Sequence, residues 1–240
     1  MDRILIAILL LMFVVLDCSN RGEPTVDAQV TASSASETII NIEGFRTGGF
    51  TMTPVIMLNE ELLYGSQSGH GPDGFHFVDD IPWIGAGDEC HLYIDYDDGV
   101  CEATEIVPGD FTITAPTPEF TLHPYAGLTT SWETSVDAEW YRLTVYMMYL
   151  YYDTDGEGHV FQFSIDTTLQ KNSYRISTER LYPDDIASID MQFQSAGKVR
   201  VAAVSGPQPT DHESNIDGDG LGTFCCYYWA EPVYFTVEFE

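Results

Sequence analysis

Basic residues are scarce in this chain of 240 residues: nine Lys plus Arg stand against 38 Asp plus Glu, for a formal net charge of −29. A field of that sign repels phosphate backbones and anionic lipid, so it disfavours both nucleic acid as a partner and polybasic attachment to a membrane. The acidic side chains are spread along the chain and form no tail, which indicates a solvated, self-repelling surface.

Helical periods and catalytic spacings are lacking as well. No stretch keeps an apolar period of 3.6 residues for three turns, which argues against helical domains. The Gly-rich loop from Tyr64 to Gly74 holds Ser and His but neither a nucleophile elbow nor a phosphate-binding loop, so it is interpreted as a connection between strands. The His residues show no ligand or triad spacing, and no Cys/His pairing indicates zinc.

The longest apolar run, Ile4 to Leu16, is too short to cross a bilayer as a helix and has the length of a signal-peptide core. Residues 1–17 are therefore predicted to be a signal peptide, and residues 18–24 a polar tether. Cys18 directly behind the run resembles the lipid-modified Cys of bacterial lipoproteins, which implies attachment to the cell envelope. Asp17 stands where such sites usually carry a small residue, so cleavage with release, or an uncleaved signal, stays open.

Four cysteines follow Cys18, at positions 90, 101, 225 and 226. An exported protein can oxidise such thiols, but no simple cross-strand pairing follows from their spacing. Buried free thiols are the favoured interpretation. Cys225 and Cys226 are neighbours, so in an extended strand their side chains must point to opposite faces.

Residues 25–114 are predicted to form an all-β, immunoglobulin-like sandwich. Short runs rich in Val, Ile, Phe and Tyr alternate there with Gly, Pro and Asp clusters, which is typical of short strands joined by turns. The predicted strands are Val26–Ala32, Thr38–Phe45, Pro54–Leu58, Gly74–Val78, Cys90–Tyr96, Val100–Ile106 and Phe111–Thr114.

A proline-rich joint at residues 115–118 is expected to separate this region from a second one, 119–240. The second region resembles a fibronectin type III domain, which implies a second β-sandwich. The residues that carry the resemblance are Leu128–Trp132 as strand B, Tyr141–Val145 as strand C, Ser173–Ser177 as strand E and Lys198–Gly206 as strand F. Residues 186–196 and 207–223 depart from the pattern as long insertions, and we expect such loops to carry what is particular to this protein.

Two acidic loops suggest calcium. Asn215, Asp217 and Asp219 alternate before a Gly, and so do Asp153, Asp155 and Glu157, as oxygen ligands do in calcium loops. Both loops lack the bidentate Glu at the twelfth position, and plain turns are the alternative interpretation. Calcium is the one cofactor that the sequence suggests.

The outer side of strand C is the other candidate site. If Tyr141, Leu143 and Val145 point inward, Trp140, Arg142, Tyr146 and Met148 point outward, beside Arg200 of strand F. Aromatic rows of this kind stack on sugars or anchor a protein partner. The alternative is that the neighbouring domain or the inserted loops cover the row.

The combined prediction is an all-β protein of two tandem sandwiches, immunoglobulin-like and then fibronectin type III-like, behind a signal segment. The favoured function is that of a non-enzymatic, lipid-anchored or secreted surface protein, acting in adhesion, assembly or ligand recognition. Its expected partner is a protein or a glycan. A carbohydrate-binding accessory protein and a calcium-stabilised module are the alternatives, and an enzyme is the least favoured class because no carboxylate pair stands out.

Overall fold

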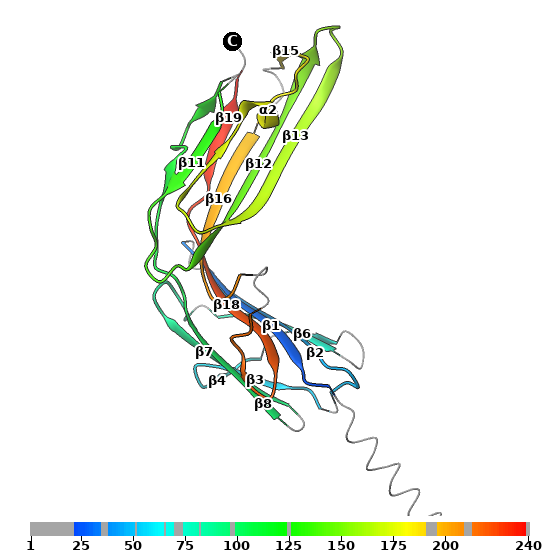
Figure 1. Cartoon of the computed structure of the whole chain (residues 1–240), viewed down its shortest axis with the longest axis vertical. Coiled ribbons are helices and arrows are strands. Elements are labelled where there is room, and N and C mark those ends of the chain that lie inside the picture. The colour runs from blue at the N-terminus through cyan, green and yellow to red at the C-terminus, as the bar shows by residue number, and fades with distance from the viewer. Residues whose placement is uncertain are drawn as a thin grey trace, which may run out of the picture.

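The computed structural model describes residues 22–34, 38–50, 52–64, 66–69, 74–81, 83–96, 99–123, 126–190, 196–208 and 213–238. These residues form strands almost throughout, with one short helix, α2 (Thr178–Leu181). Figure 1 shows two lobes, which we call the first and the second sandwich. The predicted all-β sandwich class is confirmed.

The first sandwich is the lower lobe of Figure 1 and consists of two sheets. One sheet contains, in spatial order, β5 (Ser66–Gly69), β6 (Gly74–Asp80), β2 (Thr38–Phe45), β1 (Thr25–Ser33) and β18 (Leu221–Trp229). The other contains β17 (Asp217–Gly218), β8 (Gly99–Ile106), β7 (Glu89–Tyr96), β3 (Val55–Leu58) and β4 (Glu61–Leu62). Alternate residues of each long strand are buried between the sheets, as in β1, where Val26, Ala28 and Val30 face the core.

The second sandwich is the upper lobe. Its larger sheet holds β13 (Gly158–Leu169), β12 (Trp140–Asp153), β16 (Ala196–Ser205), β19 (Val233–Val237) and β10 (Thr121–Leu122), and β15 (Ile186–Ile189) pairs with the far end of β12. Its smaller sheet holds β14 (Ser173–Ile176), β11 (Leu128–Trp132) and β9 (Ile113–Ala115). The segments predicted as strands B, C, E and F are thus all strands.

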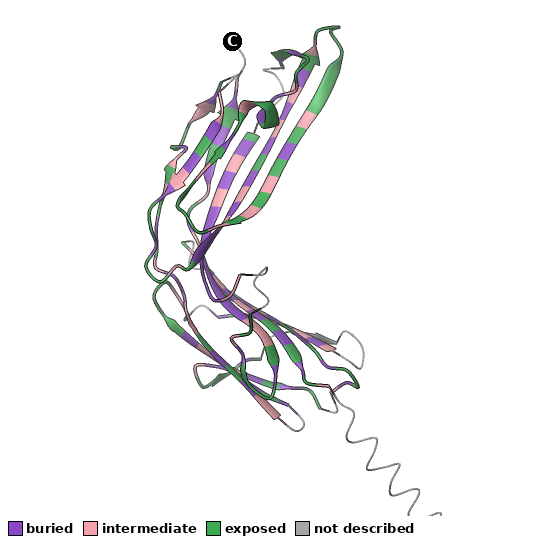
Figure 2. Ribbon diagram, viewed as in Figure 1, coloured by how far each residue is buried: buried purple, intermediate pink, exposed green. Residues whose placement is uncertain are grey.

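The core of the second sandwich follows from the two apolar rows. Leu128, Thr130 and Trp132 of β11 are buried, and so are Tyr141 and Leu143 of β12. Trp132 lies with its ring centroid 5.5 Å from that of Tyr141, so the two sheets meet across this pair. Figure 2 shows the alternation of buried and half-buried positions along β12 and β16.

The strand pairing corrects the predicted boundary of the second unit. Residues 119–240 were expected to form one sandwich, but β18 pairs in parallel with β1 along its whole length, from Thr25 opposite Leu221 to Ser33 opposite Trp229. β17 likewise pairs with β8. The chain leaves the second sandwich after β16, completes the first sandwich, and returns as β19. The predicted strand at 111–114 also differs, because it appears as β9 and pairs with β11 in the second sandwich.

One sheet passes through both lobes. The end of β16 pairs with the end of β18, from Ala202 opposite Trp229 to Ser205 opposite Cys226. Five buried residues pack at this junction: Trp140, Ala202, Val204, Cys225 and Tyr227. Cys226 instead faces the core of the first sandwich, so the two neighbouring cysteines point to opposite sides, as predicted. All four described cysteines are free and buried.

Candidate functional site

The solvent side of the larger sheet of the second sandwich gathers basic and aromatic side chains. Strand register places them in three rows across the sheet: Tyr234, Lys198 and Tyr146; then Arg200, Thr144 and Asp166; then Trp229, Ala202 and Arg142. The exposed or half-buried residues among them define what we call the outer face: Arg142, Thr144, Tyr146, Asp166, Lys198, Arg200, Trp229 and Tyr234.

Basic groups on the outer face are held by aromatic rings and by one carboxylate. The Arg200 guanidinium carbon lies 4.1 Å from the Trp229 ring centroid, and the Lys198 ammonium lies 5.1 Å from that of Tyr234. Among the residues that the structure describes, neither Lys198 nor Arg200 forms an ion pair with a carboxylate. These two basic residues therefore keep their charge available to a partner.

Arg142 differs from the other two because it is neutralised within the sheet. Its Nε and Nη2 donate to the two carboxylate oxygens of Asp166, at 2.9 and 2.6 Å. These bonds lower the pKa of Asp166 below its usual range and raise that of Arg142. The pair leaves the outer face with a local excess of positive charge in an otherwise acidic protein.

Trp140 was predicted to point outward with this row, and that prediction is wrong. Its side chain is 1% exposed, its Nε1 donates to the carbonyl oxygen of Gly206 at 2.8 Å, and its ring packs edge-on against Tyr227. The cause is the return of β18, which covers this end of β12. A sugar platform made of Trp140 and Tyr146 is therefore removed.

The other predicted residues of the row do share the outer face or border it. Tyr146 is 38% exposed, and its hydroxyl lies 3.5 Å from the sulfur of half-buried Met148. Lys198, Trp229 and Tyr234 were not among the predicted site residues. The alternation of Val233, Tyr234 and Phe235 in the sequence is the signal that identifies Tyr234 as outward-facing.

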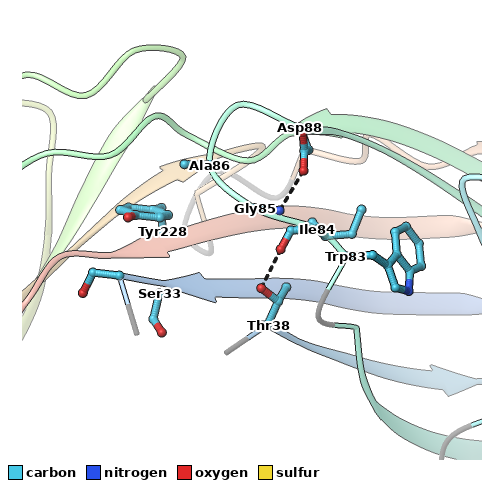
Figure 3. Close-up of a pocket in the computed structure, with 9 residues that line it drawn as sticks. Ser33, Thr38, Trp83, Ile84, Gly85, Ala86, Asp88 and Tyr228 are labelled. Atoms are coloured by element: carbon cyan, nitrogen blue, oxygen red, sulfur yellow. Dashed lines mark hydrogen bonds between the residues drawn. The ribbon is translucent and has the colours of Figure 1, made fainter. Parts of the chain in front are cut away.

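A pocket of about 390 Å³ opens in the first sandwich, near its junction with the second. Figure 3 shows Trp83 and Tyr228 on opposite sides of it, with Thr38 and Ile84 between them. Its lining comprises Ser33, Ser34, Thr38, Trp83, Ile84, Gly85, Ala86, Asp88 and Tyr228. Sequence reasoning missed this pocket because residues 81–88 match no motif, and Tyr228 reaches it only through the pairing of β18 with β1.

The acidic loop at 153–157 uses its first carboxylate internally. Asp153 Oδ1 accepts bonds from the backbone N–H groups of Asp155 and Glu157, both at 2.9 Å, and Oδ2 lies 2.8 Å from His159 Nε2. These contacts lower the pKa of Asp153, with the His159 contact as the largest cause. The arrangement is that of a turn closed by an Asp side chain.

The loop at 215–219, which contains β17, bonds to both β8 and β18. Asn215 Nδ2 donates to Glu105 Oε1 at 2.7 Å and to the carbonyl of Phe224, while its Oδ1 accepts from the N–H of Phe224. Asp219 Oδ2 accepts from the N–H of Val100, and Asp217 lies on β17 opposite Glu102. Within the described residues, no three His, Cys, Asp or Glu side chains gather as a metal site. Calcium binding stays a prediction.

Cys18 and the signal segment lie outside the described residues. So do residues 65 and 70–73 of the Gly-rich loop, 191–195 of the first insertion and 209–212 of the second. In the part of the chain that is described, no helix has the length and apolar character needed to span a membrane.

The thiol side chains of the described residues are buried, and most of the imidazoles contact a neighbouring side chain. Burial raises the pKa of the Cys101 and Cys225 thiols, to about 12 for Cys225, so neither forms a thiolate readily. His91 lies 3.5 Å from Glu102, and His76 lies 2.7 Å from the Asn41 side chain. His91 lies on β7 and His76 on β6, so the two imidazoles belong to different sheets.

Comparison with known proteins gives little. No protein-family model and no curated protein matches the chain. Among solved structures, the chain is similar to the fibronectin(III)-like modules of Clostridium thermocellum CbhA, at 12% identity, with a TM-score of 0.28, over 90% of this chain and 94% of the other. A likeness of that level supports no inference about function, so the fold rests on the strand pairing described above.

Proposed function

We propose that this protein is a non-catalytic recognition protein that binds the acidic surface of a partner protein through the outer face. The observation that carries the proposal is the placement of Lys198 and Arg200 on aromatic rings of one sheet, with no carboxylate partner among the described residues, in a chain with net charge −29. Export and attachment to the cell envelope through Cys18 belong to the same proposal and rest on the sequence.

The chemistry of the outer face suits a protein partner. Tyr, Trp and Arg are the residues most enriched at interface hot spots, because they combine a large apolar area with a polar group. Tyr234 is 59% exposed and Tyr146 38% exposed, so both rings are available for contact. The β-sheet backbone holds these side chains at set spacings, which reduces the entropy lost on binding.

Charge favours a compact acidic patch over a long polyanion. At physiological ionic strength the Debye length is about 8 Å, so a local basic face can attract an acidic patch despite the negative charge elsewhere. A nucleic acid extends beyond the face and would lie along acidic regions, where it is repelled. The partner is therefore a folded protein or a peptide segment with clustered Asp and Glu.

The absence of a catalytic role in this proposal is supported by the titratable groups. A thiol acts as a nucleophile in its ionised form, and burial opposes ionisation of Cys225 and Cys226. His159 is bonded to a carboxylate that closes a turn. No described site combines a nucleophile, a base and an orienting group.

Fluorescence anisotropy with a labelled hexaglutamate peptide, which is short enough to lie within the outer face, tests that face at physiological ionic strength. We expect Lys198→Glu with Arg200→Glu to weaken binding more than about tenfold, because both available charges are reversed. The matched control is Lys171→Glu with Arg175→Glu, which makes the same change of net charge on exposed positions away from the face.

The control should weaken binding by less than about threefold, since it alters only the long-range field. Equal losses in the two double variants would show that net charge alone governs binding. Failure of the unmodified chain to bind the hexaglutamate peptide would also contradict the proposal.

A further inference from the structure

The pocket beside Trp83 has the chemistry of a carbohydrate site. We infer that it binds a neutral sugar ring, which stacks on the Trp83 indole and bonds through its hydroxyl groups to Asp88 and to Ser33 or Ser34. None of these residues belongs to the outer face, so the inference stands independently of the proposed function. Four observations carry it: the exposure of Trp83, the order of its loop, the polar atoms of the lining and the charge of the protein.

Trp83 is an exposed aromatic side chain whose segment is anchored on either side by a buried isoleucine. Ile81 and Ile84 are 1% and 4% exposed and anchor the segment in the core, while Trp83 is 46% exposed at the pocket. An indole left half in water forgoes part of the favourable burial of a large apolar side chain. A ligand that covers the ring regains that free energy, which is the usual reason for a tryptophan at a sugar site.

The Trp83 loop is tied down on both sides. The N–H of Ile81 donates to the carbonyl of Thr38 at 2.8 Å, and the Thr38 hydroxyl, itself buried, donates to the carbonyl of Ile84 at 2.7 Å. The N–H of Gly85 donates to Asp88 Oδ2 at 2.8 Å, as Figure 3 shows. The platform is thus ordered before a ligand arrives, which lowers the entropy cost of binding.

Polar atoms line the rest of the pocket. Asp88 uses one carboxylate oxygen for Gly85, and a carboxylate has about four acceptor positions, so it can accept further bonds from sugar hydroxyls. Ser33 and Ser34 contribute two hydroxyls, and that of Ser34 donates to Glu231 at 3.2 Å, which leaves its oxygen able to accept. Tyr228 closes the opposite side.

Size and charge narrow the ligand to a neutral sugar. A volume of about 390 Å³ is near the lower end of the range for small-ligand sites, roughly 300–1,000 Å³, and suits one or two rings. Asp88 and the net charge of −29 repel phosphates and uronic acids. A pyranose offers apolar C–H groups on its face and hydroxyls around its rim, matching an indole that is surrounded by acceptors.

Isothermal titration of the chain with cellohexaose, maltohexaose, mannohexaose and chitohexaose tests the inference, with hexagalacturonate as the charged comparison. We expect at least one neutral hexasaccharide to bind and hexagalacturonate not to bind. Trp83→Ala should weaken binding more than tenfold through the loss of stacking, by about 1.4 kcal/mol or more. The matched control is Tyr64→Ala, which removes another aromatic ring of the first sandwich that is 84% exposed.

Asp88→Asn separates recognition from loop structure. An Asn side chain keeps an oxygen that can accept from Gly85, but it loses the charge and an acceptor. We expect this variant to bind the neutral sugar several-fold more weakly, to bind hexagalacturonate detectably, and to melt within a few degrees of the unmodified chain. The inference fails if no neutral hexasaccharide binds at millimolar concentration, or if Trp83→Ala and Tyr64→Ala bind equally well.

Discussion

The two sandwiches differ in how the chain supplies their strands. In the second, β12 and β13 form a hairpin with unbroken register from Tyr141 opposite Leu169 to Tyr152 opposite Gly158. In the first, β1 is completed by β18, which lies almost 200 residues later and runs parallel to it. A parallel pair cannot be joined by a short turn, so it depends on a long connection through other structure. The first sandwich therefore needs both its N-terminal strand β1 and the late strand β18, which the chain reaches only after it has formed most of the second sandwich.

The consequence is a junction built from both lobes. β18 buries Phe224, Cys226 and Tyr228 on the side of the first core, and Cys225 and Tyr227 on the side of Trp140. A strand buried on both faces has a continuous apolar run, which here is Phe224 to Trp229. The stability of the two sandwiches should thus be linked through this strand.

Gly222→Ala is expected to lower stability the most, because it disrupts the pairing of β18 with β1. Gly222 has φ +138°, and a Cβ there would overlap the carbonyl oxygen of Val26. Backbone strain and steric overlap together should lower the free energy of unfolding by about 3 kcal/mol or more, measured by urea denaturation. The first sandwich should unfold at a lower urea concentration in this variant.

Gly156→Ala is its control in the second sandwich. Gly156 also has a positive φ, +84°, but no heavy atom lies within 4 Å of the Cβ that would be added. Only strain remains, at about 1 kcal/mol. Similar costs for the two variants would show that the β1–β18 pairing contributes nothing special.

Trp140→Phe compared with Trp132→Phe tests the junction against the interior of the second sandwich. Both indoles are buried, but Trp140 Nε1 bonds to Gly206, whereas Trp132 Nε1 has no partner among the described residues. Trp140→Phe should therefore cost about 1–3 kcal/mol more than Trp132→Phe, because it removes the donor to a buried carbonyl. Equal losses of unfolding free energy in chemical denaturation would contradict a stabilising role for the bond from Trp140 to Gly206.

Two acidic residues should make the stability of the two sandwiches depend on pH in opposite directions. These are the smallest effects that we expect. Burial raises the pKa of Glu105 in the first sandwich, so its stability contribution is present at low pH and is lost as pH rises through the folded pKa. Arg142 lowers the pKa of Asp166 in the second, so that contribution is present above the unfolded pKa, about 3.9, and is lost as pH falls.

Thermal melts from pH 3 to 8 measure both effects. Glu105→Gln should raise the melting temperature at pH 7 and have little effect below about pH 4.3, because the amide cannot ionise. Asp166→Asn should lower it at pH 7, by an amount that shrinks as pH falls from about 3.9 toward the lowered pKa of Asp166 in the folded chain. Shifts of the same sign at pH 7 would refute the assignment.

Local patterns in the sequence predicted most strands. The alternation of apolar residues from Trp140 to Val145 predicted β12, and the strands expected between residues 26 and 106 are all present within a few residues. These signals are local because side chains alternate faces along any strand. β13 was not predicted, although a strand pattern continues across Gly158–Leu169. The short strands β17 and β19 were not predicted because they depend on distant partners.

The candidate sites were less accessible from sequence. Arg142, Tyr146 and Met148 were placed on one side of β12 by alternation alone, and the structure agrees. The Trp83 pocket joins three distant parts of the chain, represented by Thr38, Trp83 and Tyr228, which no short window contains. Only strand pairing between distant segments brings them together.

By itself, the sequence determined most of the strands between residues 26 and 106 and the core strands of the second sandwich, which side of each of these is apolar, and the acidic charge of the whole. The tertiary structure decided which residues on the other side of each strand are exposed to solvent. Trp140 and Tyr146 belong to the same row of one strand, yet β18 buries the first and leaves the second exposed. The reason is physical: alternation is a property of a single strand, whereas burial depends on which distant segment packs against it.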